Sequence, residues 1–205
     1  MRALLITGGT GGLGHSVVAG LAAEYRCIVL YRSEEAWQQL RSSIRGDNIT
    51  GATDPSQVKD PIYGVLHLAG AFTMGGSTQD FQRMLDASLL SAVEVIQAVE
   101  KRIIDGGRVI AISSAATLTK PAGMAAYVSA KSALNAYIEV LSKELQPRKI
   151  TVNAILPTAL DTPKERKTMS RELLVPLQRV VDTLAFLLSD GAASITGQLI
   201  ALTSS

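Results

Sequence analysis

Tyr127 and Lys131, in the pentapeptide YVSAK at residues 127–131, are a pair whose residue types and spacing could transfer a proton. The flanking apolar residues recur at helical intervals, so the two side chains are predicted to share one helix face, with Cβ atoms roughly 5–6 Å apart. An ammonium close to a phenol favours the phenolate and lowers its pKa from about 10. The pair therefore predicts a proton donor at Tyr127 near neutral pH, although the spacing alone also fits a core tyrosine beside a solvated lysine.

Ser114 ends the run RVIAISS at residues 108–114, thirteen positions before Tyr127. Its hydroxyl could donate to a carbonyl oxygen that also accepts the tyrosine proton. Ligands of a doubly wound sheet bind at the carboxyl ends of the strands, where a loop carrying Ser114 and the start of the Tyr127 helix would meet. We therefore expect Ser114, Tyr127 and Lys131 to converge at that edge.

Residues 7–14 read TGGTGGLG, with five glycines in eight positions directly after an apolar run. A strand, a glycine-rich turn and a helix bring main-chain N–H groups against a phosphate, because glycine tolerates positive φ and has no Cβ to hold the ligand away. A turn that only packs a strand on its helix would need two glycines, so five indicate a pyrophosphate site. Two patterns fit, and the spacing does not choose between GxGxxG at Gly9, Gly11 and Gly14 and TGxxxGxG at Gly8, Gly12 and Gly14.

Short apolar runs alternate with longer stretches of helical period along the chain. Strands are predicted at residues 3–7, 27–31, 64–69, 108–113, 151–156 and 199–202, and helices at 12–25, 34–44, 78–102, 125–145 and 171–189. The segment 46–61 is poor in apolar residues, so a further strand there is expected to be short, at 49–53, with a helix of about two turns at 55–59. This alternation predicts a doubly wound parallel α/β sheet of the Rossmann type with helices on both faces.

Composition limits the class of protein. At 205 residues and 47% hydrophobic content, the chain suits one domain over residues 1–205. The 20 basic and 18 acidic residues are spread along it, which predicts no nucleic-acid partner, and no run approaches the roughly 20 apolar residues of a membrane span. The first residues lack the regions of a signal peptide, and a single cysteine fits a reducing compartment, so we expect a cytoplasmic protein without a metal site.

The sequence also resembles the short-chain dehydrogenase/reductase family over nearly its whole length. It has the family's TGxxxGxG turn as TGGTGGLG, its strand-end serine as ISS at 112–114, and its YxxxK as YVSAK. VNAILPTALDT at 152–162 is similar to the family's VNxIxPGxxxT segment, and AFLLSDGAASITGQLI at 185–200 is similar to its C-terminal signature. Five motifs in the family's order and spacing favour membership over chance.

The resemblance implies hydride transfer between a nicotinamide dinucleotide and a carbonyl or alcohol carbon of a small molecule. By position, it makes Tyr127 the acid/base, Ser114 the group that orients and polarises the substrate oxygen, and Lys131 the residue that holds the nicotinamide ribose while acidifying the phenol. The cofactor-binding positions that it implies are Gly8, Thr10, Gly12, Leu13, Gly14, Arg32, Ala69, Gly70, Tyr127, Lys131, Pro157 and Thr162.

Four departures from the family pattern concern the same site. HLAG at 67–70 stands where the family has NNAG, and Ser88 aligns with the asparagine that completes the family's catalytic tetrad. Ser88 is therefore a candidate for the water-holding role of that asparagine. Thr158 replaces the glycine of the family's PG dipeptide, and the segment 162–182 is short for the part that covers the substrate, which predicts an open site.

Arg32 bears on the choice of cofactor. It follows the predicted strand CIVLY, eighteen residues after Gly14, where an acidic residue would bind the ribose 2′-OH and favour NAD(H). An arginine at that place can pair with the 2′-phosphate, so we expect NADP(H), with NAD(H) possible if Arg32 is merely solvated. The basic residue often found inside the family's glycine turn is absent, because Gly11 occupies its place.

Two other function classes stay open. A non-catalytic module that senses the NADP(H) redox state is favoured by the missing tetrad asparagine and opposed by the intact serine, tyrosine and lysine. A structural subunit is the second, since the family's oligomers pack through helices matching 78–102 and 125–145, whose apolar content exceeds one buried stripe. This content predicts a homodimer or homotetramer.

Several residues that could bind a ligand or react are instead given structural interpretations. His15 is assigned to a helix surface rather than to a phosphate, His67 to a buried structural hydrogen bond, and Cys27 to the core. The KERK run at 164–167 is interpreted as a solvated loop, with steering of acidic substrates as the lesser alternative. Substrate choice is expected to lie in the loops 71–78, 115–124 and 159–170.

Overall fold

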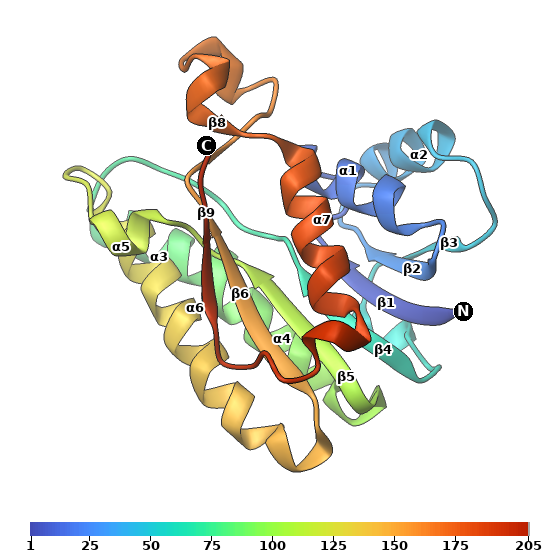
Figure 1. Cartoon of the computed structure of the whole chain (residues 1–205). Coiled ribbons are helices and arrows are strands. Elements are labelled where there is room, and N and C mark those ends of the chain that lie inside the picture. The colour runs from blue at the N-terminus through green and yellow to red at the C-terminus, as the bar shows by residue number, and fades with distance from the viewer. Residues whose placement is uncertain (205) are drawn as a thin grey trace.

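A seven-stranded parallel sheet forms the centre of the computed structural model, which describes residues 1–204 (Figure 1). Its strands are β1 (Arg2–Thr7), β2 (Tyr25–Leu30), β3 (Ile49–Ala52), β4 (Ile62–His67), β5 (Ile103–Ile112), β6 (Thr151–Pro157) and β9 (Leu199–Leu202). They lie in the order β3-β2-β1-β4-β5-β6-β9. The chain leaves β1 toward β2 and later returns to place β4 on its other side, so the carboxyl ends of β1 and β4 flank the point where a doubly wound sheet binds ligands.

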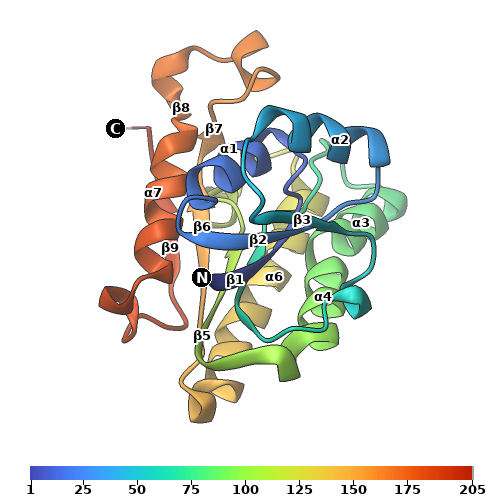
Figure 2. The ribbon, with the colours of Figure 1, turned by 90° about the vertical axis from the view of Figure 1, so that its right-hand side faces the viewer.

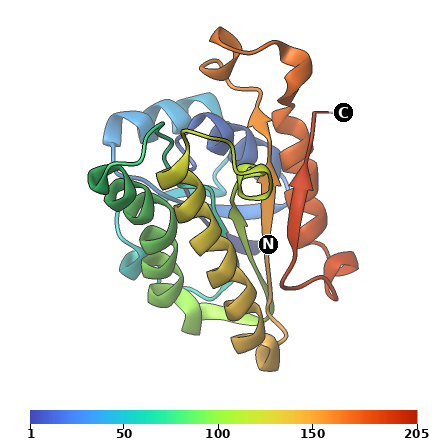
Figure 3. The same ribbon diagram turned by 90° about the vertical axis from the view of Figure 1, so that its left-hand side faces the viewer.

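Helices cover both faces of the sheet. One face carries α1 (Gly12–Leu21), α2 (Glu34–Ser43) and α7 (Leu177–Leu188), and the other carries α3 (Thr78–Leu85), α4 (Ser91–Val99) and α6 (Ala125–Glu144) (Figures 2 and 3). Successive strand residues alternate between two cores: Leu4 and Ile6 pack on the side of α1 and α7, whereas Ala3 and Leu5 pack on the side of α4 and α6. Because both faces are covered, the strands are apolar almost throughout, which confirms the predicted fold class.

Shorter elements complete the fold. They are α5 (Ala116–Thr119), the two-stranded parallel sheet of β7 (Ala159–Leu160) and β8 (Leu174–Val175), a π-helix at Asp86–Leu90, and 3₁₀ turns at Pro55–Gln57, Glu100–Arg102, Gln146–Arg148, Glu165–Lys167, Arg171–Leu173 and Asp190–Ala192. Within residues 1–204, none of the helices combines the length and apolar character needed to cross a bilayer.

Some predicted boundaries were wrong. The helix expected over 78–102 consists of α3, the π-helix at Asp86–Leu90, α4 and the 3₁₀ turn Glu100–Arg102. The helix expected from residue 171 begins only at Leu177, because Leu174 and Val175 pair with β7. Pro176 is the N-cap residue that precedes α7. The helix expected at 55–59 is the single 3₁₀ turn Pro55–Gln57.

Candidate active site

The glycine turn joins β1 to α1 at the carboxyl edge of the sheet. Gly8 has φ of +67°, and a Cβ there would lie 2.7 Å from the Ala69 nitrogen, so neither its conformation nor its surroundings accept a side chain. A Cβ at Gly14 would lie 2.5 Å from the Gly9 Cα, and one at Gly9 would lie 2.8 Å from Val29 Cγ1. Packing of strand, turn and helix therefore accounts for three glycines, one more than the sequence interpretation assigned to packing alone.

Gly12 has a different environment from these three. A Cβ there would find its nearest neighbour, Thr162 Cγ2, at an ordinary contact distance of 3.6 Å, and the residue is exposed. It begins α1, whose N-cap Gly11 supplies no side-chain hydrogen bond. By contrast, α2 is capped by Ser33, which accepts from the Ala36 nitrogen at 3.2 Å. The first N–H groups of α1 are thus left for a ligand, as a phosphate site requires.

Ser114 and Tyr127 meet at the same edge of the sheet. Ser114 follows the end of β5 and is 4% exposed, and Tyr127 lies in the first turn of α6. The Ser114 hydroxyl lies near enough to the phenol to act on the pKa of Tyr127. Main-chain bonds hold the serine loop in place, including Ala115 N to Pro157 O at 2.9 Å. The structure therefore brings together the serine and the tyrosine that the sequence singled out.

Lys131 lies one turn further along α6, in the interior. Its side chain is 4% exposed, and its ammonium donates to the Ile112 main-chain oxygen at 2.9 Å. Gly70, after β4, lies above the ammonium, where an added Cβ would be 3.1 Å from Nζ. Burial lowers the pKa of Lys131 to about 8, because the charged form is poorly solvated there.

The expected acidification of Tyr127 by Lys131 was wrong for this state of the protein. The pKa of Tyr127 is raised, chiefly by burial of the phenol and further by the Glu165 carboxylate, while the hydrogen bond with Ser114 acts in the opposite direction. Lys131 donates to the end of β5 instead of to the phenol. A shared helix face therefore does not by itself bring the ammonium close enough to stabilise the phenolate.

Ser88 and His67 form a buried polar group behind the lysine. Ser88 is fully buried in the π-helix, and its Oγ has no hydrogen-bond partner among the described residues. His67 is fully buried with Nδ1 3.0 Å from Thr7 Oγ1, so its predicted structural hydrogen bond is confirmed. Burial, with the charge of Lys131 adding to it, lowers the pKa of His67 to about 3. His67 is therefore neutral, and the Ser88 hydroxyl is free to hold a water.

Arg32 is exposed beyond the carboxyl end of β2. It lines a cavity of about 410 Å³ together with Gln79, Gln82, Arg83, Asp86 and Ala87 of α3 and the π-helix. Two guanidinium groups and the Asp86 carboxylate thus border one hollow, which begins beyond the carboxyl end of β2. The sequence identified Arg32 but gave no signal for Arg83, which is thirteen residues beyond HLAG in a helix of ordinary pattern.

The segment that follows β6 brings a carboxylate near the phenol. Pro157 ends β6, and Asp161 is paired with Arg166 at 2.9 Å and with Arg171 at 3.7 Å, which ties the short segment down. Glu165, in that segment, lies near enough to raise the pKa of Tyr127. Glu165 of the KERK run therefore lies near the phenol, while Lys164, Arg166 and Lys167 are exposed, as a solvated loop requires.

Phe72 is a site residue that sequence reasoning missed. Its ring meets the Tyr127 ring edge-to-face with centroids 5.0 Å apart, and the residue is 47% exposed. Four other exposed apolar side chains lie in the segments that follow β4, β5 and β6: Met74, Leu118, Met169 and Leu173. An aromatic residue two positions after HLAG was the available signal. His15 and Cys27 lie apart from this group, as expected: His15 contacts Ser43 Oγ at 2.7 Å on the surface, and Cys27 is buried.

Comparison with known proteins identifies the family. A family model described as enoyl-(acyl carrier protein) reductase matches residues 60–203, well over half of the chain, including the serine, tyrosine and lysine positions. The chain belongs to the short-chain dehydrogenase/reductase family. It is thus an oxidoreductase by family.

Individual relatives cover nearly the whole of this short-chain dehydrogenase/reductase. The chain is 26% identical to the 3-oxoacyl-[acyl-carrier-protein] reductase of Escherichia coli, over 95% of this chain and 92% of that protein. It is 28% identical to the L-xylulose reductase of Bos taurus, over 97% and 93%. The structure of a short-chain dehydrogenase/reductase from Serratia marcescens superposes with a TM-score of 0.87 at 24% identity, covering 98% of this chain and 96% of the other, which shows a common fold.

Proposed function

We propose that this short-chain dehydrogenase/reductase transfers hydride between a nicotinamide dinucleotide, NADP(H) in preference to NAD(H), and a carbonyl or alcohol carbon of a small molecule. The observation that carries the proposal is the meeting of Ser114, after β5, and Tyr127, in the first turn of α6, at the carboxyl edge of the sheet, with Lys131 buried one turn further along α6. Two relatives that cover over nine-tenths of the chain are named as reductases, which supports the same chemistry.

The residues around the glycine turn fit a dinucleotide. The N-terminus of α1 has no side-chain cap, Gly12 is exposed beside Thr162, and Gly70 lets the main chain approach the lysine ammonium closely. In the proposed complex Gly8, Thr10, Gly12, Leu13 and Gly14 cradle the pyrophosphate, and Ala69, Gly70, Lys131, Pro157 and Thr162 border the nicotinamide half. When bound, the cofactor supplies or accepts the hydride.

Side chains of the protein donate the proton and stabilise the negative charge that hydride transfer produces. Hydride arriving at a carbonyl carbon leaves negative charge on the oxygen, so Ser114 donates a hydrogen bond to it while Tyr127 donates its proton. A phenol with a raised pKa keeps its proton at neutral pH and gives it up only to the stronger base that forms in the reaction. Lys131 holds the ribose hydroxyls, and the Ser88 hydroxyl holds a water behind it, in place of the family's asparagine.

Arg32 is proposed to select NADP(H). It borders the cavity at the end of β2, and Arg83 adds a second positive group to the same hollow. A 2′-phosphate would receive charge-assisted hydrogen bonds there, whereas a bare ribose hydroxyl would gain much less.

The apolar side chains around Phe72 favour substrates whose carbonyl is carried on an apolar body. The experiment is NADPH and NADH oxidation by the wild-type protein with a panel of aldehydes, ketones, quinones and pterins, read at 340 nm. Turnover of at least one member, faster with NADPH, is expected. Binding of NADPH without turnover of any member would favour a redox sensor instead.

We also propose that the protein assembles into a homodimer or homotetramer through α4 and α6. Leu90, at the end of the π-helix, and Val140, on α6, are about half exposed on this side of the molecule, at 50% and 53%. Exposed apolar side chains of this size on neighbouring helices suit a self-complementary interface. Light scattering tests this proposal, and a monomer would contradict it.

A further inference from the structure

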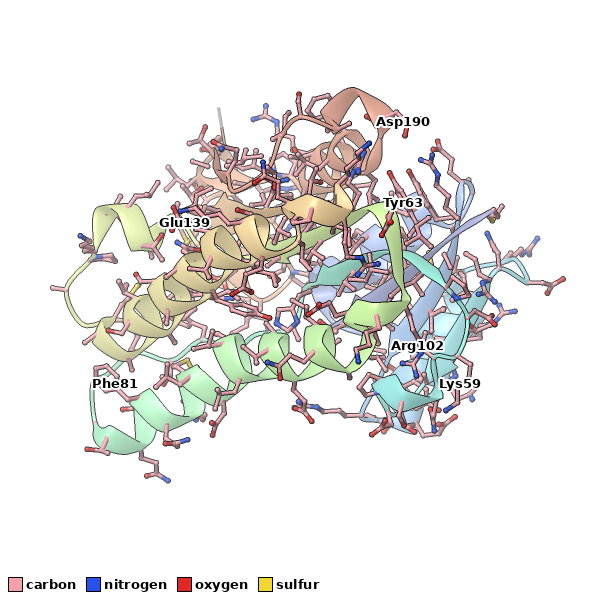
Figure 4. All side chains as sticks on the ribbon, turned by 90° about the horizontal axis from the view of Figure 1, so that it is seen from below. Lys59, Tyr63, Phe81, Arg102, Glu139 and Asp190 are labelled. Carbon is pink, nitrogen blue, oxygen red and sulfur yellow. The ribbon has the colours of Figure 1, made fainter. Side chains whose placement is uncertain are left out.

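A second hollow lies at the opposite end of the sheet from Ser114 and Tyr127. This cavity of about 740 Å³ is bordered by the amino ends of β1, β4, β5 and β6 and by the loop after α7. Figure 4, which looks at the molecule from below, shows Tyr63 and Asp190 close together there. Arg2 connects them, since its guanidinium pairs with Asp190 at 3.1 Å and its Cζ lies 4.3 Å from the centre of the Tyr63 ring.

Arg108 is a buried cation in the wall of this cavity. It is 2% exposed, and its guanidinium donates to main-chain oxygens, to Gly107 O at 3.1 Å and to Ser189 O at 3.1 Å. Its Nε has no hydrogen-bond partner among the described residues. A buried, charged donor without an acceptor is costly, so it indicates a missing partner.

Thr151 supplies a second unpartnered donor beside the first. Residue 151 of β6 pairs in register with Arg108 of β5, so the two side chains project side by side from the same face of the sheet. Thr151 is 4% exposed, and its Oγ1 also has no partner. Of the four such atoms in the described part of the chain, two therefore belong to adjacent residues of one cavity wall.

Charge in this cavity is not balanced by the protein. Both carboxylates that border it are already paired, Asp190 with Arg2 at 3.1 Å and Asp105 with Arg148 at 2.9 Å. Arg108 and Lys149 have no carboxylate partner within residues 1–204. The hollow thus offers two uncompensated cations and an unused hydroxyl, which an anion would satisfy.

We infer that this cavity binds the phosphate group of a small molecule, at a site separate from the dinucleotide. A carboxylate is best recognised by two parallel guanidinium N–H groups, but the terminal nitrogens of Arg108 already bond main-chain oxygens. Arg108 Nε, the Thr151 hydroxyl and the Lys149 ammonium are single donors on three separate side chains, which suit the several oxygens of a phosphate better. The volume leaves room for the organic part of a phosphate ester.

Inorganic phosphate is the probe, with sodium chloride of equal ionic strength as the reference. Thermal unfolding of the wild-type protein should shift upward with phosphate concentration and saturate. Lys149→Gln and Thr151→Val should each weaken the fitted phosphate affinity about tenfold. Thr151→Val removes an unpartnered buried hydroxyl, so it should fold at least as well as wild type in phosphate-free buffer.

Two matched controls separate binding in this cavity from a general effect of surface charge. Lys143→Gln and Arg45→Gln each remove an exposed cation that borders neither cavity, with the same change of charge. Both should keep the phosphate response of wild type. A wild-type protein without a saturable response, or a response that survives Lys149→Gln and Thr151→Val unchanged, would overturn the inference.

Discussion

Replacing Lys131 by methionine should stabilise the cofactor-free protein at pH 7. The lysine is buried, and its pKa is lowered from 10.5 in the unfolded chain to about 8. A shift of this size means that folding penalises the ammonium by about 3 kcal/mol at pH 7. Methionine has a similar shape and no charge, so it removes the penalty. It also leaves the Ile112 oxygen without its donor, which costs about 1 kcal/mol, and the net gain is about 2 kcal/mol.

The stability difference between Lys131→Met and wild type should change with pH in one direction. Below about pH 8 both the folded and the unfolded wild-type chains carry the proton, so the penalty is constant. Between pH 8 and 10.5 the unfolded chain binds more protons than the folded one, so the stability contributed at this position rises with pH. The advantage of Lys131→Met should therefore be full at pH 7 and be lost by pH 10.5.

Urea unfolding of wild type and Lys131→Met, from pH 7 to pH 10.5 without cofactor, measures this difference. Lys143→Met is the matched control, since it removes an exposed lysine from the same helix and should show no such slope. If Lys131→Met is less stable than wild type at pH 7, or if its difference from wild type does not change with pH, the ammonium is not penalised by burial and the reasoning fails.

Four further substitutions test the cofactor and substrate positions. Gly14→Ala should lower the free energy of unfolding by about 2–3 kcal/mol, because its Cβ would clash with the backbone of the turn. Gly12→Ala should fold normally and weaken NADPH binding about tenfold. Urea unfolding and NADPH titration measure the two effects, and equal stability of the two variants would contradict the packing argument. Arg32→Gln should raise the KM for NADPH about tenfold and leave the KM for NADH unchanged. Arg45→Gln, which removes another exposed arginine, is the control and should change neither KM. An equal effect of Arg32→Gln on both cofactors would exclude recognition of the 2′-phosphate. Ser114→Ala should lower kcat about 10²–10³-fold with little change in KM for NADPH, and a wild-type rate would remove Ser114 from the site.

The sequence was sufficient for the architecture because its apolar runs are fully buried strands. Leu4, Leu5 and Ile6 are each fully buried, and such runs between helical stretches have few alternatives to a parallel sheet. The convergence of Ser114 and Tyr127 was predictable for the same reason, since both follow directly from where β5 ends and α6 begins.

The electrostatics and the irregular segments were not predictable in the same way. The direction of the Tyr127 pKa depends on burial and on Glu165, which is brought in by the Asp161 ion pairs. The π-helix at Asp86–Leu90 has no local signature in the residues DASLL, and β7 and β8 are two-residue strands that form only because tertiary packing brings them together. Long-range placement, not local preference, decides these features.

The Tyr127→Phe variant tests the central claim most directly, because it removes one hydroxyl and keeps the ring that packs on Phe72. Tyr137→Phe makes the same change ten residues along α6 and serves as the control. With the best substrate of the carbonyl panel, Tyr127→Phe should bind NADPH like wild type and oxidise it about 10²–10⁴-fold more slowly, while Tyr137→Phe keeps the wild-type rate. A wild-type rate in Tyr127→Phe would show that this hydroxyl does not donate the proton, and the proposed chemistry would be wrong.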